Sequence, residues 1–197
     1  MKQDLAGVKM ANPSRVTEHV ARAWYEGDNA LHPYEGETKP IQENPKYQPG
    51  DGMYSWFKAP RYDGEPCEVG PLARTLVAYA KGHDGIVGTV NHVIKTLGIE
   101  PKHLFSTLGR TAARGIEALV IGEATQGWVM ELVDNLKSGD TATYEPYEMP
   151  DSGMGVGLND VPRGALGHWI EIEDQKIKNY QYVVPSTWNA GPRDGAD

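Results

Sequence analysis

The sequence contains a single cysteine, Cys67, among 197 residues. One cysteine excludes an intramolecular disulfide and any cluster of thiolate ligands supplied by this chain alone. No run approaches the roughly 18–20 apolar residues that a membrane-spanning helix needs. The first residues, MKQDLAGVKMANPSRV, lack the continuous apolar core of a signal peptide. We therefore expect no export signal of the chain's own.

Basic residues are scarce as well. Lys and Arg number 19 against 27 Asp and Glu, which gives a formal charge of −8. Phosphate binding needs a concentrated basic surface, so we expect no nucleic acid partner. Apolar residues make up 39% and charged residues 23% of the chain, which is an ordinary globular composition. At 197 residues, the chain is long enough to bury a core.

The apolar pattern predicts a mainly α fold with a small β-hairpin near the C-terminus, an α+β class. We expect a first helix over 11–27, because Val16, Val20 and Trp24 recur at i, i+4 and i+8. From about 28 to 71 prolines interrupt every possible helix, which predicts an irregular segment that clads the protein or contacts a partner.

Helical sequence fills about 71–138. Asp84 is the expected N-cap of its second helix, and we expect the last helix to break or bend near Gly122 or Gly127. Residues 141–162 are expected to be irregular. Alternation over about 165–186, with a turn at Asp174-Gln175, predicts the hairpin.

Several motifs have a plain structural interpretation. The string GMGVG, residues 153–157, has the wrong spacing for a dinucleotide fingerprint, so we expect a flexible turn. Cys67 has no Cys-x-x-Cys partner and is expected to be structural or incidental. No histidine has the spacing of a paired metal ligand, and we expect His168 to hydrogen-bond to nearby backbone.

Arg163 and Ser186 are the candidate functional side chains. Pro162 fixes the backbone before Arg163 and Gly164 removes bulk after it, so the guanidinium is either a surface cation beside a turn or a cation aimed into a pocket. Ser186 follows Pro185 and two valines, so its hydroxyl either serves a turn or helix N-cap or donates to an acceptor at the end of a strand.

Together these strings resemble the large subunit of nickel–iron hydrogenases, most closely the uptake, membrane-associated type. The resemblance covers essentially the whole chain and is carried by AWYEG…LHPYEGETKP, YSWFKAPRYDGEPCEVGPLARTLVAY, STLGRTAARGIEAL, VPRGALGHWIEI and NYQYVVPSTWNAGPRD. It implies a partial hydrogenase large-subunit fold, a single partial domain over 1–197. It also implies oxidation of hydrogen, or reduction of protons, at a nickel–iron centre whose iron carries cyanide and carbon monoxide.

In that family, two Cys-x-x-Cys pairs hold the metals, and this sequence contains neither. Nickel in a sulfur site needs soft thiolate donors. We therefore expect a central-to-C-terminal fragment that by itself binds no nickel and turns over no hydrogen, and whose missing remainder of the large subunit supplies the thiolates.

The resemblance also assigns roles to residues. By this resemblance, Arg163 would lie over the metal pair as a catalytic group, and Arg163 and Ser186 would donate hydrogen bonds to the cyanide nitrogens while Pro162 and Pro185 would shape the pocket. The backbone carbonyl of Tyr182 would be a ligand of a structural magnesium ion. We expect Lys58 and Glu18 to contact the water shell of that ion.

The implied partner is an iron–sulfur small subunit, with which the chain would be exported to the periplasmic side of the cytoplasmic membrane. Contact with the membrane would be indirect, through partner subunits. Three alternatives stay open: a hydrogen-sensing regulatory homologue, a metal-free scaffold subunit like the one in respiratory complex I, and a truncated interaction module. Retention of Arg163, Pro185 and Ser186 argues against the scaffold.

Overall fold

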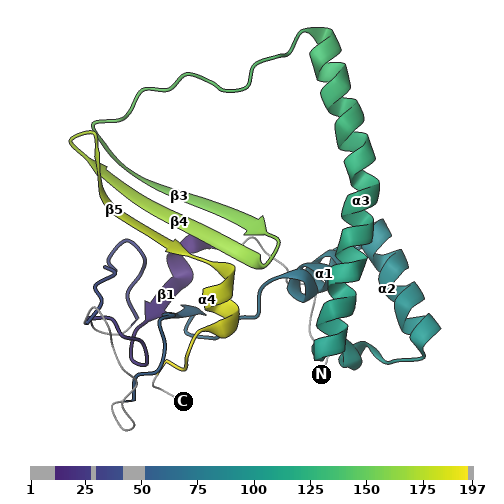
Figure 1. Ribbon diagram of the computed structural model, residues 1–197, viewed down its shortest axis with the longest axis horizontal. Helices are drawn as coiled ribbons and strands as arrows, with labels where there is room; N and C mark the ends of the chain where they lie inside the picture. The colour runs from purple at the N-terminus through teal and green to yellow at the C-terminus, as the bar shows by residue number, and fades with distance from the viewer. Residues whose placement is uncertain (1–11, 28–29, 42–51, 195–197) are drawn as a thin grey trace. The chain divides into compact units, whose positions relative to one another are not determined.

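The computed structural model describes residues 12–27, 30–41 and 52–194 (Figure 1). They form two compact units, which we call the helical unit, residues 71–148, and the sheet unit, residues 12–70 together with 149–194. Residues 1–11, most of the N-terminal stretch read for a signal peptide, lie outside the described residues, as do residues 28–29 and 42–51 of the expected irregular segment. The single-domain boundary of 1–197 stays a prediction.

Three α-helices and a short 3-10 helix build the helical unit. In chain order they are α1 (Pro71–Ala80), α2 (Asp84–Leu97), the 3-10 helix η3 (Pro101–Phe105) and α3 (Thr107–Ser138). The side chain of His83 caps α2 by accepting from the backbone N–H of Ile86, so the expectation that Asp84 is the N-cap was wrong. A core joins the helices: Leu72, Ile86, Val90, Leu104, Ala113 and Ile116.

The helix α3 runs without a break from Thr107 to Ser138, contrary to the expected break near its glycines. Ser106 caps its start by accepting from the N–H of Gly109 at 3.1 Å, and Gly139 ends it in a left-handed conformation. All its buried residues lie before residue 117, and its second half exposes apolar side chains such as Trp128, Leu132 and Leu136. No helix of the described residues has both the length and the apolarity to cross a membrane.

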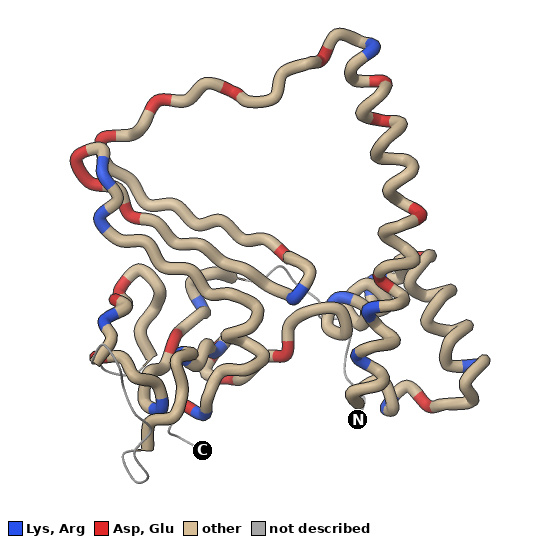
Figure 2. Tube along the Cα trace, viewed as in Figure 1, with Lys and Arg blue, Asp and Glu red and all other residues tan. Residues whose placement is uncertain are grey.

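An extended segment, residues 140–150, follows α3. Figure 2 shows acidic and no basic residues along it, and the sequence gives them as Asp140, Glu145 and Glu148. Tyr144 and Tyr147 are about four-fifths exposed, at 79% and 82%. The segment therefore contributes negative charge and aromatic surface without a core of its own.

The sheet unit begins with a 3-10 helix and a strand where a helix was expected over 11–27. The 3-10 helix η2 (Pro13–Arg15) is capped by Asn12, and β1 (Val16–His19) pairs antiparallel with β2 (Ala59–Tyr62). The expectation of a helix was wrong because β1 alternates buried and half-buried residues, a period of two that the spacing of Val16 and Val20 also satisfies.

A three-stranded antiparallel sheet follows, drawn in green and yellow in Figure 1. Its strands are β3 (Ser152–Val161), β4 (Gly164–Glu173) and β5 (Lys176–Val183). The β4–β5 turn lies at Asp174 and Gln175, where it was expected, and both residues have positive φ, as a two-residue type I′ turn requires. The expectations of irregular chain over 152–161 and of a flexible turn at GMGVG were wrong, because these residues form β3.

The helix α4 (Pro185–Ala190) ends the described fold. One face of the sheet carries Trp169 and Val183, which with Val16 make the core of this unit. Helices and small antiparallel sheets in the described residues confirm the expected α+β class.

Candidate functional site

Arg163 lies in a two-residue turn between β3 and β4. Val161 pairs with Gly164, so Pro162 and Arg163 alone make the connection. Both turn residues are exposed, and the guanidinium of Arg163 makes no ion pair or side-chain hydrogen bond with any residue that the structure describes. The fold therefore places this cation in a short, exposed turn.

The turn is held by close backbone contact with residues 69–70. Gly164 has φ +134°, and a Cβ there would come within 2.7 Å of the backbone nitrogen of Gly70. Gly70 has φ +117°, and a Cβ there would come within 2.7 Å of the carbonyl oxygen of Arg163. Only glycine permits this approach on both sides.

The side chain of Asn189 joins the turn to α4. Its Oδ1 accepts from the N–H of Val69 at 3.0 Å, while its Nδ2 donates to the carbonyl of Val69 at 2.9 Å and to that of Arg163 at 3.5 Å. The sequence motifs did not single out this residue. The signal that could have found Asn189 is its position three residues after Ser186, one helical turn further along the chain.

Ser186 is half-buried at the second position of α4, whose N-cap is Val184 and whose first residue is Pro185. Ser186 therefore does not cap this helix. Because Ser186 and Asn189 are three residues apart, they share a face of α4, and that face is directed to the backbone of Arg163. The convergence of the Arg163 and Ser186 side chains on one pocket stays a prediction.

A buried ion pair lies in the sheet unit beside the strand of Tyr182. Lys58 Nζ is 3.5 Å from Glu18 Oε2, and the two side chains are only 10% and 8% exposed. The ammonium also donates to Thr38 Oγ1 at 3.0 Å and to Gln181 Oε1 at 3.4 Å. Burial raises the pKa of Glu18, and the charge of Lys58 opposes this by lowering it.

The Tyr182 ring lies on the opposite face of β5 from Gln181 and is 58% exposed. It packs with His168 and Tyr180 at centroid distances of 6.2 and 6.1 Å. His168 Nδ1 and the Tyr180 hydroxyl are 2.5 Å apart, so this histidine is paired with a side chain and not with the expected backbone group.

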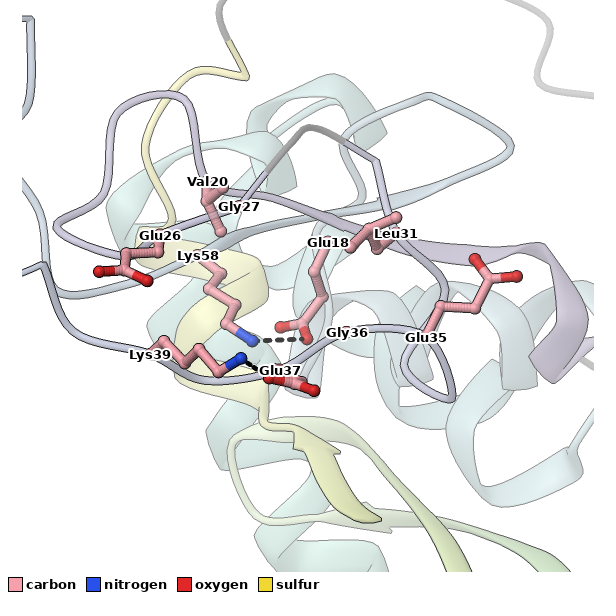
Figure 3. Close-up of a pocket in the computed structure, with 10 residues that line it drawn as sticks. All are labelled: Glu18, Val20, Glu26, Gly27, Leu31, Glu35, Gly36, Glu37, Lys39 and Lys58. Carbon is pink, nitrogen blue, oxygen red and sulfur yellow. Dashed lines mark ion pairs between the residues drawn. The ribbon is translucent and has the colours of Figure 1, made fainter.

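A cavity of about 290 Å³ opens over the Glu18–Lys58 pair (Figure 3). A second ion pair, Glu37 with Lys39, lies at the same cavity. The lining residues are Glu18, Val20, Glu26, Gly27, Leu31, Glu35, Gly36, Glu37, Lys39 and Lys58. Four carboxylates against two ammonium groups make the cavity negative, so it would attract cations.

The donor set does not fit a nickel site. Cys67 is half-buried, and burial raises the pKa of its thiol, which favours the protonated form over the thiolate that a metal binds. The described residues contain no group of three or more His, Cys, Asp or Glu side chains placed to hold a metal ion. They also form no complete magnesium site, and the buried carboxylate of Glu18 is paired with Lys58.

Comparisons with known proteins decide the family. The family model described as nickel-dependent hydrogenase matches residues 1–197. The chain belongs to the nickel-dependent hydrogenase family. Among relatives of this hydrogenase family, the chain is 42% identical over 205 residues to the uptake hydrogenase large subunit of Bradyrhizobium diazoefficiens and 42% identical over 209 residues to the Hydrogenase-1 large chain of Escherichia coli. Each match covers 95% of this chain and 34% of the relative.

Solved hydrogenase structures agree. A [NiFeSe]-hydrogenase of Desulfomicrobium baculatum superposes with a TM-score of 0.75 at 33% identity, covering 95% of this chain and 37% of that one. The chain thus spans about a third of the length of the hydrogenase large subunits that it matches. The predicted family resemblance is confirmed.

Proposed function

We propose that this chain acts as part of the large subunit of a nickel–iron hydrogenase that oxidises hydrogen or reduces protons and passes electrons to an iron–sulfur small subunit. The observation that carries the proposal is the Arg163 turn. Family membership predicts a cation next to the metals, and Arg163 is a cation without a counter-charge among the described residues, on a backbone fixed by Gly164, Gly70 and Asn189.

In this proposal Arg163 would be the catalytic cation, and Arg163 and Ser186 would donate hydrogen bonds to the cyanide nitrogens, while Pro162 and Pro185 would shape the pocket wall. A cyanide nitrogen is an anionic acceptor, so donation from a guanidinium is charge-assisted. When bound, the nickel–iron group supplies the hydrogen chemistry. The four thiolates that hold it must come from polypeptide other than residues 1–197, because Cys67 cannot supply them, and residues 1–197 alone should bind no stoichiometric nickel.

For magnesium we propose the backbone carbonyl of Tyr182 as one ligand. The buried Glu18 and Lys58 would hydrogen-bond to water on that ion. Magnesium prefers hard oxygen ligands and retains several waters, so a site with one carbonyl and water-mediated contacts is chemically suitable. The negative cavity beside this pair supports the proposal.

The names of the relatives support a proposed location. Their names include uptake hydrogenases and a quinone-reactive Ni/Fe-hydrogenase of Wolinella succinogenes, which is 39% identical over 211 residues. We propose a periplasmic-side position on the cytoplasmic membrane, reached with the small subunit and held through partner subunits.

A chimera tests the proposal. The 197 residues would replace the matching part of the Escherichia coli Hydrogenase-1 large chain, and hydrogen-dependent dye reduction and nickel content would be measured on the purified enzyme. Arg163→Met should lower kcat by about 100- to 1,000-fold while nickel content stays stoichiometric. Arg114→Lys, an exposed change in α3, is the control and should have no effect.

Either of two results would oppose the proposal. An Arg163→Met chimera with full activity would show that this guanidinium is not at the reacting centre. Stoichiometric nickel on the isolated 197-residue chain would show that it needs no thiolates from other polypeptide.

A further inference from the structure

The second half of α3 exposes a stripe of apolar side chains along one face. The stripe consists of Ile121, Trp128, Val129, Leu132 and Leu136, which follow one another at the three-, four- and seven-residue spacings of a single helix face. Each is between 47% and 58% exposed. At a rise of about 1.5 Å per residue the stripe is about 22 Å long. Figure 1 shows this half of α3 extending beyond α1 and α2, whose side chains bury its first half.

The charged residues of this half lie off the stripe. At about 100° per residue, Glu123 and Asp134 lie on the side of the helix opposite to the stripe, and Lys137 lies between them and its edge. A helix with one apolar and one charged side is typical of an element that buries its apolar side against another element. A contiguous apolar surface left open in water marks an interaction site. The stripe is therefore a docking face.

The charge of this helix argues against a second copy of the chain as the occupant. The second half of α3 carries the carboxylates of Glu123, Glu131 and Asp134 and a single cation, Lys137. That cation already lies 3.8 Å from the Asp134 carboxylate. Two copies would bring two negative helices together, in chains that each have a formal charge of −8.

The length of the relatives indicates a different occupant. The match to the Desulfomicrobium baculatum hydrogenase covers 95% of this chain, and therefore most of α3, but only 37% of that chain. The match to the Escherichia coli Hydrogenase-1 large chain covers 34% of that relative. A hydrogenase large subunit thus contains far more polypeptide than residues 1–197, and that polypeptide is available to cover the stripe.

We propose that the stripe packs against a helix of the hydrogenase large subunit that lies outside residues 1–197. This inference rests on the proposed function, because it takes the chain to be part of such a subunit. The partner helix carries its own apolar residues at three- and four-residue spacing over about four turns, so that the side chains of the two helices interdigitate. Trp128, the largest side chain of the stripe, is the central anchor of this contact.

The test compares the same substitutions in two settings, the 197-residue chain by itself and the Hydrogenase-1 chimera. Trp128→Glu places a charge in the middle of the stripe. Met130→Glu is the matched control, because Met130 is 52% exposed against 56% for Trp128 and lies about 200° further around the helix. Trp128→Leu keeps the position apolar and should behave like the parent.

In the chimera, Trp128→Glu should bury an unpaired charge. We expect it to lower the amount of soluble large subunit by about threefold or more. We also expect it to lower the midpoint of thermal unfolding by about 5 °C or more, whereas Met130→Glu should cause less than half of either effect. In the 197-residue chain, position 128 is exposed, so both variants should keep the parent midpoint within about 2 °C.

These measurements do not depend on nickel or on hydrogen oxidation. A chimera that fails to oxidise hydrogen but shows the expected loss for Trp128→Glu would oppose the proposed catalytic role and leave the docking face supported. Light scattering coupled to size-exclusion chromatography would give the oligomeric state of the 197-residue chain.

Four results would overturn the proposal. Trp128→Glu may leave the chimera unaffected, which would mean that nothing covers the stripe. Equal losses from Trp128→Glu and Met130→Glu would mean that the stripe is not the contact face. A matching loss from Trp128→Glu in the 197-residue chain would mean that this chain covers the stripe itself. A dimer of the 197-residue chain that Trp128→Glu converts to monomers would assign the stripe to a second copy.

Discussion

Asn189 holds the peptide groups of Val69 with both ends of its side-chain amide. The oxygen accepts from the Val69 N–H at 3.0 Å, and the nitrogen donates to the Val69 carbonyl at 2.9 Å. The residues are 120 positions apart. This paired contact connects the last helix to the loop that supports the Arg163 turn, so the position of the candidate catalytic cation depends on it.

Replacing Asn189 by Asp should show how much this contact contributes. The carboxylate can still accept from the Val69 N–H, but it cannot donate to the carbonyl, which it instead repels. Because the side chain is exposed, we expect a loss of about 1 kcal/mol in the free energy of unfolding, measured by urea denaturation. In the chimera, the same variant should lower kcat while nickel content is retained. An unchanged kcat would show that Asn189 does not position Arg163.

Gly164→Ala should be strongly destabilising. The backbone has φ +134°, and the added Cβ would lie 2.5 Å from Val69 Cγ2. Strain in this conformation is about 1–3 kcal/mol before the steric clash is counted, so we expect a loss of at least about 2 kcal/mol. Gly157→Ala in β3 is the matched control, since a Cβ there meets nothing within 4 Å. Equal unfolding midpoints for the two variants would contradict the close packing of the turn.

The Glu18–Lys58 pair should show strong coupling in a double-mutant cycle. Lys58→Met leaves a buried carboxylate without its counter-charge, and we expect a loss of about 3–5 kcal/mol. Adding Glu18→Gln should recover part of that loss, because burying an amide costs less free energy than burying an unpaired charge. Thermal or chemical unfolding of the parent, both single variants and the double variant gives the coupling energy. Additive losses would mean that the pair is not formed in solution.

The lowered pKa of His19 predicts that the stability of the fold depends on pH. Burial lowers its pKa below 6.5, while nearby Asp194 raises it and Arg61 lowers it further. The folded chain thus holds the neutral ring, and the unfolded chain takes up a proton first as the pH falls through 6.5. This contribution to stability is present at higher pH and is lost between 6.5 and the lower folded pKa.

The variant His19→Gln removes this titration. Its free energy of unfolding, followed by urea denaturation from pH 7.5 to 5, should fall less steeply than that of the parent chain. The difference between the two curves isolates His19 from the other titrating groups. A steeper fall in the variant would mean that folding raises the pKa of His19 instead of lowering it.

Sequence reasoning located the helices of residues 71–138 and the Asp174-Gln175 turn because these have strong local signals. Leu72, Leu76 and Ala80 lie at helical spacing on α1, and Gly139 ends α3 where a helix stop is expected. Gly122 and Gly127 suggested a break that does not occur, since isolated glycines lower helix stability without ending a helix.

The strands were harder to predict. In β3, glycines alternate with Met154, Val156 and Leu158, and glycine has a low intrinsic preference for strands. Val16, at the start of β1, and Val20, just after its end, fit both helical and extended periods. The pairing of β1 with β2, 40 to 46 positions along the chain, decides between them, and the local sequence does not indicate such a partner.

The candidate site could be predicted only in part from the sequence. The motif around Arg163 showed a constrained backbone, and the structure adds a two-residue turn. The role of Asn189 depends on contacts with Val69 and Arg163, which are distant in the sequence. The residue lies in one of the strings that carry the family resemblance, but local pattern gave it no role of its own.

The sheet unit is discontinuous: residues 12–70 and 149–194 complete each other, through contacts such as Thr38 with Gln181 and Arg61 with Asp194. During translation, residues 12–70 cannot complete their fold until roughly 80 further residues have been synthesised, which takes about 4 to 16 seconds at usual elongation rates. In that interval Lys58 lacks Gln181 and Arg61 lacks Asp194. The nascent chain is therefore expected to need chaperone protection until β5 and α4 leave the ribosome.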